Sequence, residues 1–159
     1  KAVSGTVLQL GAGWNHTCAV LADSTLECWG ADYRQEASDP TPVSGVSGLI
    51  SITVGTTSWV YCGLTVARTV TCWGENEWGQ VGRPAADGFF GPGPVSLPGE
   101  VTSLASMGPT VCAGLSDGSA YCWGSNDFGA LGDGDDSHLP SPFGPIDYSY
   151  VPVGVLGFS

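Results

Sequence analysis

Short apolar segments separated by glycine, proline and polar residues run through the whole chain. Segments of strand character that end in glycine lie at residues 7–11, 49–55 and 101–108, and glycine-punctuated and proline-rich connections follow further along. The chain shows no helical period of apolar residues, whereas short apolar runs bounded by turn residues are typical of strands. The pattern therefore predicts an all-β protein made of small antiparallel sheets.

One motif occurs three times in this pattern: a cysteine, nine further residues, a second cysteine and then Trp-Gly. The copies start 44 and 50 residues apart and include all six cysteines. Repetition on this scale is typical of solenoids, propellers and arrays. The cysteine pairs are Cys18 and Cys28, Cys62 and Cys72, and Cys112 and Cys122, followed by Trp29, Trp73 and Trp123.

The cysteine spacing fits a β-hairpin. If Cys112 and Cys122 face each other on antiparallel strands, the loop between the strands is formed by residues 116–118. A three-residue loop of this kind is a type I turn followed by a residue in the αL conformation, and Gly118 stands at that position. Directly opposed residues lie about 4.5 to 5.5 Å apart, within the range of a disulfide. Each pair is therefore predicted to close a disulfide across its hairpin.

The other two hairpins have Ser24 and Arg68 in place of Gly118. A residue other than glycine in αL costs about 1 kcal/mol, which a short-loop disulfide of roughly 2 to 3 kcal/mol offsets. Free thiols and a metal site are the alternatives, although metal sites use closer cysteine pairs. Disulfides persist in oxidising compartments, so the cysteines favour an extracellular or cell-surface location.

The repeat resembles that of the regulator-of-chromosome-condensation family, whose members are seven-bladed β-propellers. The matching stretches are residues 13–21, 73–82 and 123–132, which follow the family pattern of His-Thr-Cys-Ala and of Trp-Gly-x-Asn-x-x-Gly-Gln-Leu-Gly. The cysteine pairs resemble the disulfide-bearing bacterial and extracellular members. The resemblance implies one propeller blade per repeat, with repeat 1 at residues 1–47, repeat 2 at 48–100 and repeat 3 at 101–147.

The chain departs from the family in two respects. Repeat 1 loses the pattern after Trp29-Gly30, where residues 35–38 read Gln-Glu-Ala-Ser. Three repeats also cannot close a ring, because closed propellers have about four to eight blades. Residues 148–159 are expected to form an orphan strand, which is an edge that pairs readily with another sheet. We expect the chain to be completed by copies of itself or by the remaining blades of a larger propeller.

Charge is scarce and strongly acidic, with four basic residues against fifteen acidic ones and a net charge of −11. Such a chain offers no cationic patch to nucleic acid or to an anionic membrane. No apolar run approaches the roughly 20 residues that span a bilayer. Neither nucleic-acid binding nor membrane insertion is therefore expected. The chain begins at Lys1 without a signal peptide, which favours a processed product or a fragment.

Nothing in the sequence indicates catalysis, a cofactor or a metal. His16 has the position of the family's structural histidine, and His138 is expected to be solvated in a loop. Residues 132–137 resemble a calcium loop, but an EF-hand requires a glutamate at loop position 12, where Gly144 stands. Asn15 begins a formal glycosylation sequon and is a candidate glycan acceptor in a eukaryotic source, although the triplet also belongs to the repeat motif and arises there for structural reasons. The acidic residues show no pairing typical of a glycosidase.

Aromatic and C-terminal apolar residues are the candidates for binding. Trp29, Trp73 and Trp123 stand at equivalent positions and are expected to pack between blades. Residues 87–94, which lengthen the second interval, are expected to form an exposed interaction loop. Aromatic side chains are enriched in interface hot spots. The candidate interaction residues are Phe89, Phe90, Trp78, Phe128, Val151, Val153, Val155, Leu156 and Phe158.

These observations favour a non-catalytic extracellular structural or protein-interaction module. It is expected to assemble into a ring or filament through its unfinished blade edges and its C-terminal strand. The alternative is a secreted binding protein, similar to a β-lactamase inhibitor protein, that presents its loops to another protein or to a glycan.

Overall fold

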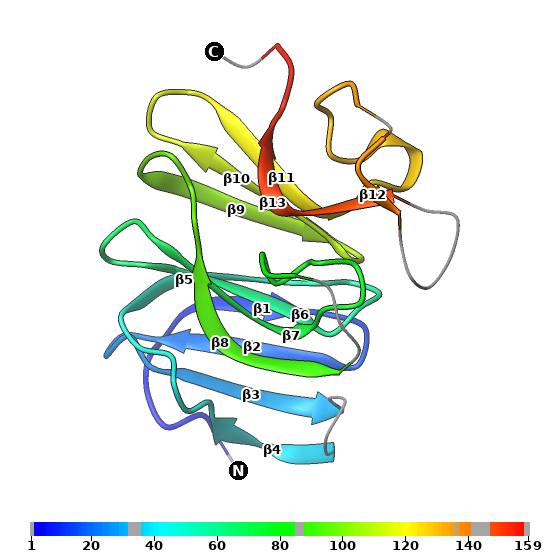
Figure 1. Cartoon of the computed structure of the whole chain (residues 1–159). Helices are drawn as coiled ribbons and strands as arrows, with labels where there is room; N and C mark the ends of the chain where they lie inside the picture. The colour runs from blue at the N-terminus through cyan, green and yellow to red at the C-terminus, as the bar shows by residue number, and fades with distance from the viewer. Residues whose placement is uncertain (1, 32–35, 85–87, 136, 141–146, 158–159) are drawn as a thin grey trace.

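The computed structural model describes residues 2–31, 36–84, 88–135, 137–140 and 147–157, which fold into three antiparallel sheets lying side by side (Figure 1). Each sheet holds one repeat, and we number the sheets blade 1 to blade 3. Blade 1 has the strand order β1 (Val7–Ala12), β2 (His16–Leu21), β3 (Leu26–Ala31) and β4 (Glu36–Pro42). Blade 2 has the order β5 (Leu49–Val54), β6 (Val60–Thr65), β7 (Val70–Glu75) and β8 (Phe89–Val95).

Blade 3 has the same four-strand plan with one short addition. Its order is β9 (Val101–Met107), β10 (Thr110–Leu115), β11 (Ala120–Ser125) and β13 (Asp147–Gly154), and β12 (Leu139–Pro140) pairs with the outer side of β13. A 3-10 turn, η1 (Asp127–Gly129), follows β11. No helix in the described part of the chain is long and apolar enough to cross a bilayer. The predicted all-β fold of three small sheets is confirmed.

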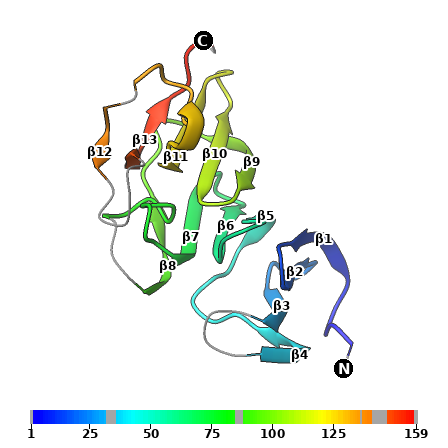
Figure 2. The same cartoon turned by 90° about the vertical axis from the view of Figure 1, so that its right-hand side faces the viewer.

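The blades fan out from a common inner edge. Figure 2 shows the first strands, β1, β5 and β9, on one side of the molecule and the fourth strands, β4, β8 and β13, on the other. The side-chain amide of Gln9 on β1 donates to the carbonyl oxygen of Ile52 on β5 over 3.1 Å and accepts from its N–H over 2.6 Å. The hydroxyls of Thr53 on β5 and Ser106 on β9 lie 2.8 Å apart. Hydrogen bonds at the inner edge therefore join consecutive blades.

The three hairpin disulfides are present in the predicted register. The cysteines of each pair stand directly opposite each other on the second and third strands, with Cα atoms 4.1, 4.2 and 4.1 Å apart. The third loop residue has the expected positive φ, 64° at Ser24, 60° at Arg68 and 90° at Gly118. The strain at the two non-glycine positions coincides with a contact between blades. Ser24 and Arg68 offer their carbonyl oxygens to the first N–H of the next blade, at Leu49 over 3.3 Å and at Val101 over 3.0 Å.

The glycine of each Trp-Gly motif is required by the backbone around it. Gly74 has φ 115°, and a side chain there would overlap the carbonyl oxygen of Trp59, the residue just before the neighbouring strand β6. Gly30 and Gly124 have the same conformation and the same close carbonyl neighbour. The recurrence of Trp-Gly thus follows from hairpin geometry as well as from packing.

The C-terminal segment is not an orphan strand, and this expectation is wrong. β13 pairs with β11, with Val153 opposite Cys122. Thr41 of β4 and Gly93 of β8 stand opposite the equivalent cysteines of blades 1 and 2, so β13 is simply the fourth strand of blade 3. The error came from spacing. The connection to the fourth strand runs over residues 126–146 in repeat 3 but only over 76–88 in repeat 2.

The core consists of two layers between the blades. Between blades 1 and 2, Cys18, Val20 and Leu26 pack against Ile52 and Trp73, among other buried residues. Between blades 2 and 3, a larger cluster is built on both sides of the interface. It includes Cys62, Leu64, Cys72 and Val81 of blade 2 and Val101, Val111, Leu115 and Trp123 of blade 3. Burial of these faces against each other holds the stack of blades together.

Candidate functional site

Each blade presents its disulfide on one face and its motif tryptophan on the other, because neighbouring residues of a strand point to opposite faces. We call these the disulfide face and the tryptophan face. The disulfide face of blade 1 meets Trp73 on the tryptophan face of blade 2. The disulfide face of blade 2 meets Trp123 on the tryptophan face of blade 3. Every junction therefore joins a disulfide face to a tryptophan face. The stack consequently ends in a tryptophan face on blade 1 and a disulfide face on blade 3.

A loop of blade 2 completes the junction with blade 3. In this 76–82 loop, the carbonyl oxygen of Gln80 accepts a hydrogen bond of 3.0 Å from the indole Nε1 of Trp123. Asn76 is buried beneath the loop, and its Oδ1 accepts the N–H of Val81 over 3.1 Å. Gly79 lies against Tyr150 on β13, so that any side chain there would collide with it. The loop thus acts as an acceptor platform for the next blade.

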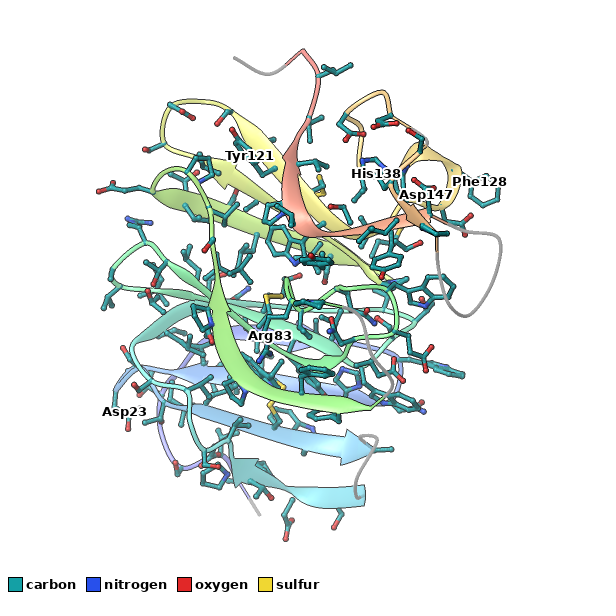
Figure 3. The ribbon with its side chains drawn as sticks, viewed as in Figure 1. Asp23, Arg83, Tyr121, Phe128, His138 and Asp147 are labelled. Atoms are coloured by element: carbon teal, nitrogen blue, oxygen red, sulfur yellow. A yellow bond between two sulfur atoms is a disulfide. The ribbon has the colours of Figure 1, made fainter. Side chains whose placement is uncertain are left out.

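Blade 3 repeats this loop at residues 126–132, but its outer side is open. The Oδ1 of Asn126 accepts the N–H of Leu131 over 3.0 Å, as Asn76 does for Val81. Phe128 is 100% exposed and has a positive φ of 55° (Figure 3). Nothing lies within 4 Å of a side chain placed at Gly129, the counterpart of Gly79. The loop is therefore built like the acceptor platform of blade 2 but carries no neighbour among the described residues.

The tryptophan face of blade 1 is the opposite open end of the stack. Trp29 is half-buried, and its indole N–H has no acceptor within the described ranges. Leu10, which pairs with Ala19 beside the motif, is 58% exposed. The backbone N–H of Ser4 donates to Glu27 over 3.1 Å and draws the chain before β1 towards this face. Blade 1 therefore offers a tryptophan donor and apolar side chains.

The disulfide face of blade 3 is the matching partner surface. Cys112 is half-buried there, whereas Cys62 and Cys72 of the enclosed blade 2 have no exposed surface. Met107 and Val151 are exposed apolar residues of the same blade, at 76% and 56%. Among the other C-terminal candidates, Val153 and Val155 are half-buried, Leu156 is exposed, and Phe158 lies outside the described residues.

Residues 89–94 are a strand and not an exposed loop, contrary to expectation. They belong to β8, the fourth strand of blade 2, and Asp87 lies outside the described residues. Phe89 meets the ring of Tyr61 edge-on at 6.5 Å. The guanidinium of Arg83 lies over the ring of Phe90, 5.3 Å from its centroid. The longer interval of repeat 2 suggested an inserted loop at residues 87–94. The extra length lies instead in the connection before β8, and β8 itself is an ordinary blade strand. Trp78, in the 76–82 loop, is half-buried.

His138 bridges two carboxylates in the long connection of blade 3. Its Nδ1 lies 2.8 Å from Oδ2 of Asp147, and its Nε2 lies 2.8 Å from Oδ2 of Asp133 (Figure 3). Asn126 also donates to Oδ2 of Asp147 over 2.9 Å. The expectation of a solvated His138 is therefore wrong: its side chain is only 11% exposed. The acidic residues that hold it come together only because β13 returns to the sheet.

These contacts shift the titration of both partners. Burial lowers the pKa of His138, but its hydrogen bonds to Asp147 and Asp133 outweigh burial and leave the pKa above its ordinary value of 6.5. Burial raises the pKa of Asp147, yet hydrogen bonds with Asn126 and His138 leave it below its ordinary value of 3.8. The pair therefore stabilises the connection most strongly when His138 is protonated and Asp147 is ionised.

We expect the protein to lose stability as the pH rises through the folded-state pKa of His138. Because folding raises this pKa, the contribution is complete below about pH 6.5 and disappears once the imidazolium loses its proton. The loss should be on the order of 1 kcal/mol, the scale of partly exposed ion pairs. Urea unfolding across this pH range measures it, with His138→Gln as the control that lacks the titration. Equal pH profiles of the two proteins would contradict the assignment. A second loss, as the pH falls below 3.8 through the folded pKa of Asp147, should remain in the variant.

The described residues show no cluster of metal ligands. Among them, no group of three or more His, Cys, Asp and Glu side chains is placed to hold a metal ion.

Sequence reasoning found the motif tryptophans and the disulfides but missed the backbone acceptors, such as Gln80, and the amide of Gln9. A carbonyl oxygen has no sequence signature, although the Gly-Gln-Val-Gly stretch marks the loop that presents it.

The fold and the junctions define this protein as three blades of a β-propeller. Residues 7–35 and 117–158 each match a model of the regulator of chromosome condensation (RCC1) repeat. The chain is 29% identical over 148 residues to the E3 ubiquitin-protein ligase HERC2 of Mus musculus, covering 86% of this chain and 3% of HERC2. It is 28% identical over 151 residues to the ultraviolet-B receptor UVR8 of Arabidopsis thaliana, covering 84% of this chain and 33% of UVR8.

A solved structure shares the whole arrangement. Prp20p of Saccharomyces cerevisiae, whose crystal structure was described with its binding properties to Gsp1p and histones, superimposes with a TM-score of 0.83 at 21% identity. The match covers 99% of this chain and 40% of Prp20p. This chain therefore spans well under half the length of each of these three proteins. Two segments of the chain thus match the regulator of chromosome condensation repeat, and its three sheets share the fold of the matched part of Prp20p.

Proposed function

We propose that this chain is a non-catalytic, extracellular protein-interaction module that joins further copies of itself head to tail. One observation carries the proposal. The junction of blades 2 and 3 joins Trp123 to the 76–82 loop, and both halves of such a junction stand open at the ends of the stack. Trp29 is the donor half on blade 1, and the 126–132 loop is the acceptor half on blade 3.

The two open ends complement each other in chemistry as well as in position. The carbonyl oxygen of Ala130 is the counterpart of that of Gln80, so it would accept the indole N–H of an incoming Trp29. A contact between two different surfaces of identical chains generates a ring or an open filament. The C-terminal strand has no part in this contact as a donated strand, because it is already paired in blade 3. The paired state of all six cysteines supports an oxidising location.

Light scattering on two single-site variants tests the head-to-tail contact. Trp29→Ala removes the donor end and Phe128→Ala trims the acceptor end, so each variant alone should be monomeric. An equimolar mixture should form a dimer and nothing larger, because one intact end of each kind remains. Val66→Ala, at a residue on the enclosed blade 2 that is 64% exposed, is the matched control and should assemble like the parent protein. A parent protein that stays monomeric at every concentration would refute the proposal.

A second candidate is a binder that presents its loops to a different protein. The full exposure of Phe128 favours it, since aromatic anchors dominate protein interfaces. Relatives with this fold have protein partners, as the binding of Prp20p to Gsp1p and histones illustrates. A monomeric parent protein whose capture of a partner depends on Phe128 would support this function in place of self-assembly.

A further inference from the structure

A cleft opens between blades 1 and 2, and Trp29 is among the residues that border it. It has a volume of about 290 Å³, near the lower limit of roughly 300 Å³ for ligand pockets. Its lining includes Thr41 and Val43 from blade 1 and Trp73, Phe89 and Gly91 from blade 2. The described lining contains no Asp, Glu, Lys or Arg side chain.

The cleft lies where repeat 1 departs from the other repeats. Residues 32–35 connect the third and fourth strands of blade 1, whereas residues 76–88 make the same connection in blade 2. The longer connection contains the 76–82 loop, and repeat 1 has no room in its sequence for such a loop. The loss of the family pattern after Trp29-Gly30 therefore has a structural counterpart at the junction of blades 1 and 2.

The equivalent place between blades 2 and 3 is filled by that loop. Val81 is completely buried there in a cluster with Cys72, Val95 and Trp123. The strand registers make these three residues the counterparts of Cys28, Val43 and Trp73. All three counterparts line the cleft. The walls that hold Gln80 and Val81 at one junction are thus present at the other.

The cleft also contains the counterpart of the donor that hydrogen-bonds to that loop. At the filled junction, the indole N–H of Trp123 donates to the carbonyl oxygen of Gln80. Trp73 stacks on Tyr61 with the ring centroids 5.6 Å apart. Within the part of the chain that the structure describes, its indole N–H donates to no acceptor. The cleft therefore combines apolar walls with the indole donor of Trp73, for which the described residues supply no acceptor.

We propose that this cleft binds an uncharged peptide turn of a partner protein, with an aliphatic side chain in the place of Val81 and a backbone carbonyl oxygen on the indole N–H of Trp73. The occupant copies what Gln80 and Val81 do at the next junction. The described lining has no Asp, Glu, Lys or Arg side chain to pair with a charge, which favours a neutral segment, because burying an unpaired charge there would be costly. Trp29, the donor half of the proposed head-to-tail contact, also borders the cleft, but binding on the indole N–H of Trp73 does not require a second copy of this chain.

Calorimetric titration of the full chain with a synthetic peptide tests the proposal. The probe is Asn-Gln-Trp-Gly-Gln-Val-Gly with blocked ends, which copies residues 76–82 with an uncharged glutamine in place of Glu77. We expect saturable binding, and no binding of the same peptide with aspartate in place of valine. Trp73→Phe keeps the ring but removes the donor, and should weaken binding about fivefold, the size of one net hydrogen bond.

Gly91→Leu is the second variant, because it does not alter the core. A side chain at Gly91 meets no atom within 4 Å of its Cβ, so the variant should fold normally and obstruct the cleft. It should abolish peptide binding and leave light scattering unchanged, which separates this site from the head-to-tail contact. Val66→Ala is the control and should bind the peptide like the parent protein. Failure of the parent protein to bind the peptide, or undiminished binding by Gly91→Leu, would overturn the proposal.

Discussion

Replacing Trp123 with alanine is expected to destabilise the protein by about 3 to 5 kcal/mol, the range for truncation of a fully buried large side chain. Trp123 has no exposed surface, and it lies in the cluster that joins blades 2 and 3. Truncation leaves a cavity between the blades and also removes the donor to the carbonyl oxygen of Gln80. Urea unfolding of the variant and the parent protein measures the difference.

The other motif tryptophans provide a matched series. Trp73→Ala should cost less than Trp123→Ala, because Trp73 borders the cleft and its indole N–H donates to no acceptor in the described ranges. Trp29→Ala should cost least, because Trp29 is half-buried at the open end of blade 1. Equal losses for all three substitutions would show that the repeat position, and not the junction, determines the contribution of the tryptophan.

Removal of the Cys62–Cys72 disulfide by a double alanine substitution is expected to destabilise the protein by about 3 kcal/mol, as the chain-entropy relation gives for a loop of this length. The loop is short, with a sequence separation of 10 residues. Both cysteines are buried between blades 2 and 3, so the substitution also loosens the cluster around Trp123. Denaturant unfolding of the double variant tests the magnitude.

The outer disulfide of blade 3 is the control for this experiment. Cys112–Cys122 closes a loop of equal separation, but Cys112 lies half-buried on an open face. Its removal should therefore cost less than removal of Cys62–Cys72. Under mild reduction followed by alkylation and mass spectrometry, Cys62–Cys72 should be the last of the three to open, since thiol exchange depends on access to a sulfur. Reduction of Cys62–Cys72 before Cys112–Cys122 would contradict the burial of blade 2.

Local patterns were sufficient for everything inside one hairpin. The spacing of Cys112 and Cys122 predicted the facing cysteines and a third loop residue in αL, and the structure has both. Prediction failed where a residue's role depends on a distant strand. Val153 was assigned to an orphan strand because the pairing of β13 with β11 spans a long connection with no periodic pattern. His138 was expected in solvent because Asp133 and Asp147 meet it only after that strand has paired.

The repeat, the hairpin register and the disulfides can be derived from the amino-acid order alone, because they depend on residues within about ten positions of each other and on general strand geometry. What each blade face contacts depends on the packing of blades against one another and follows from the fold. The backbone oxygen of Gln80 becomes an acceptor for Trp123 because two blades pack together. The cleft beside Trp73 exists where the corresponding loop is missing from repeat 1. Junctions between blades are made by carbonyl groups and by surfaces brought together from distant segments, and neither has a signature in the order of side chains along the chain.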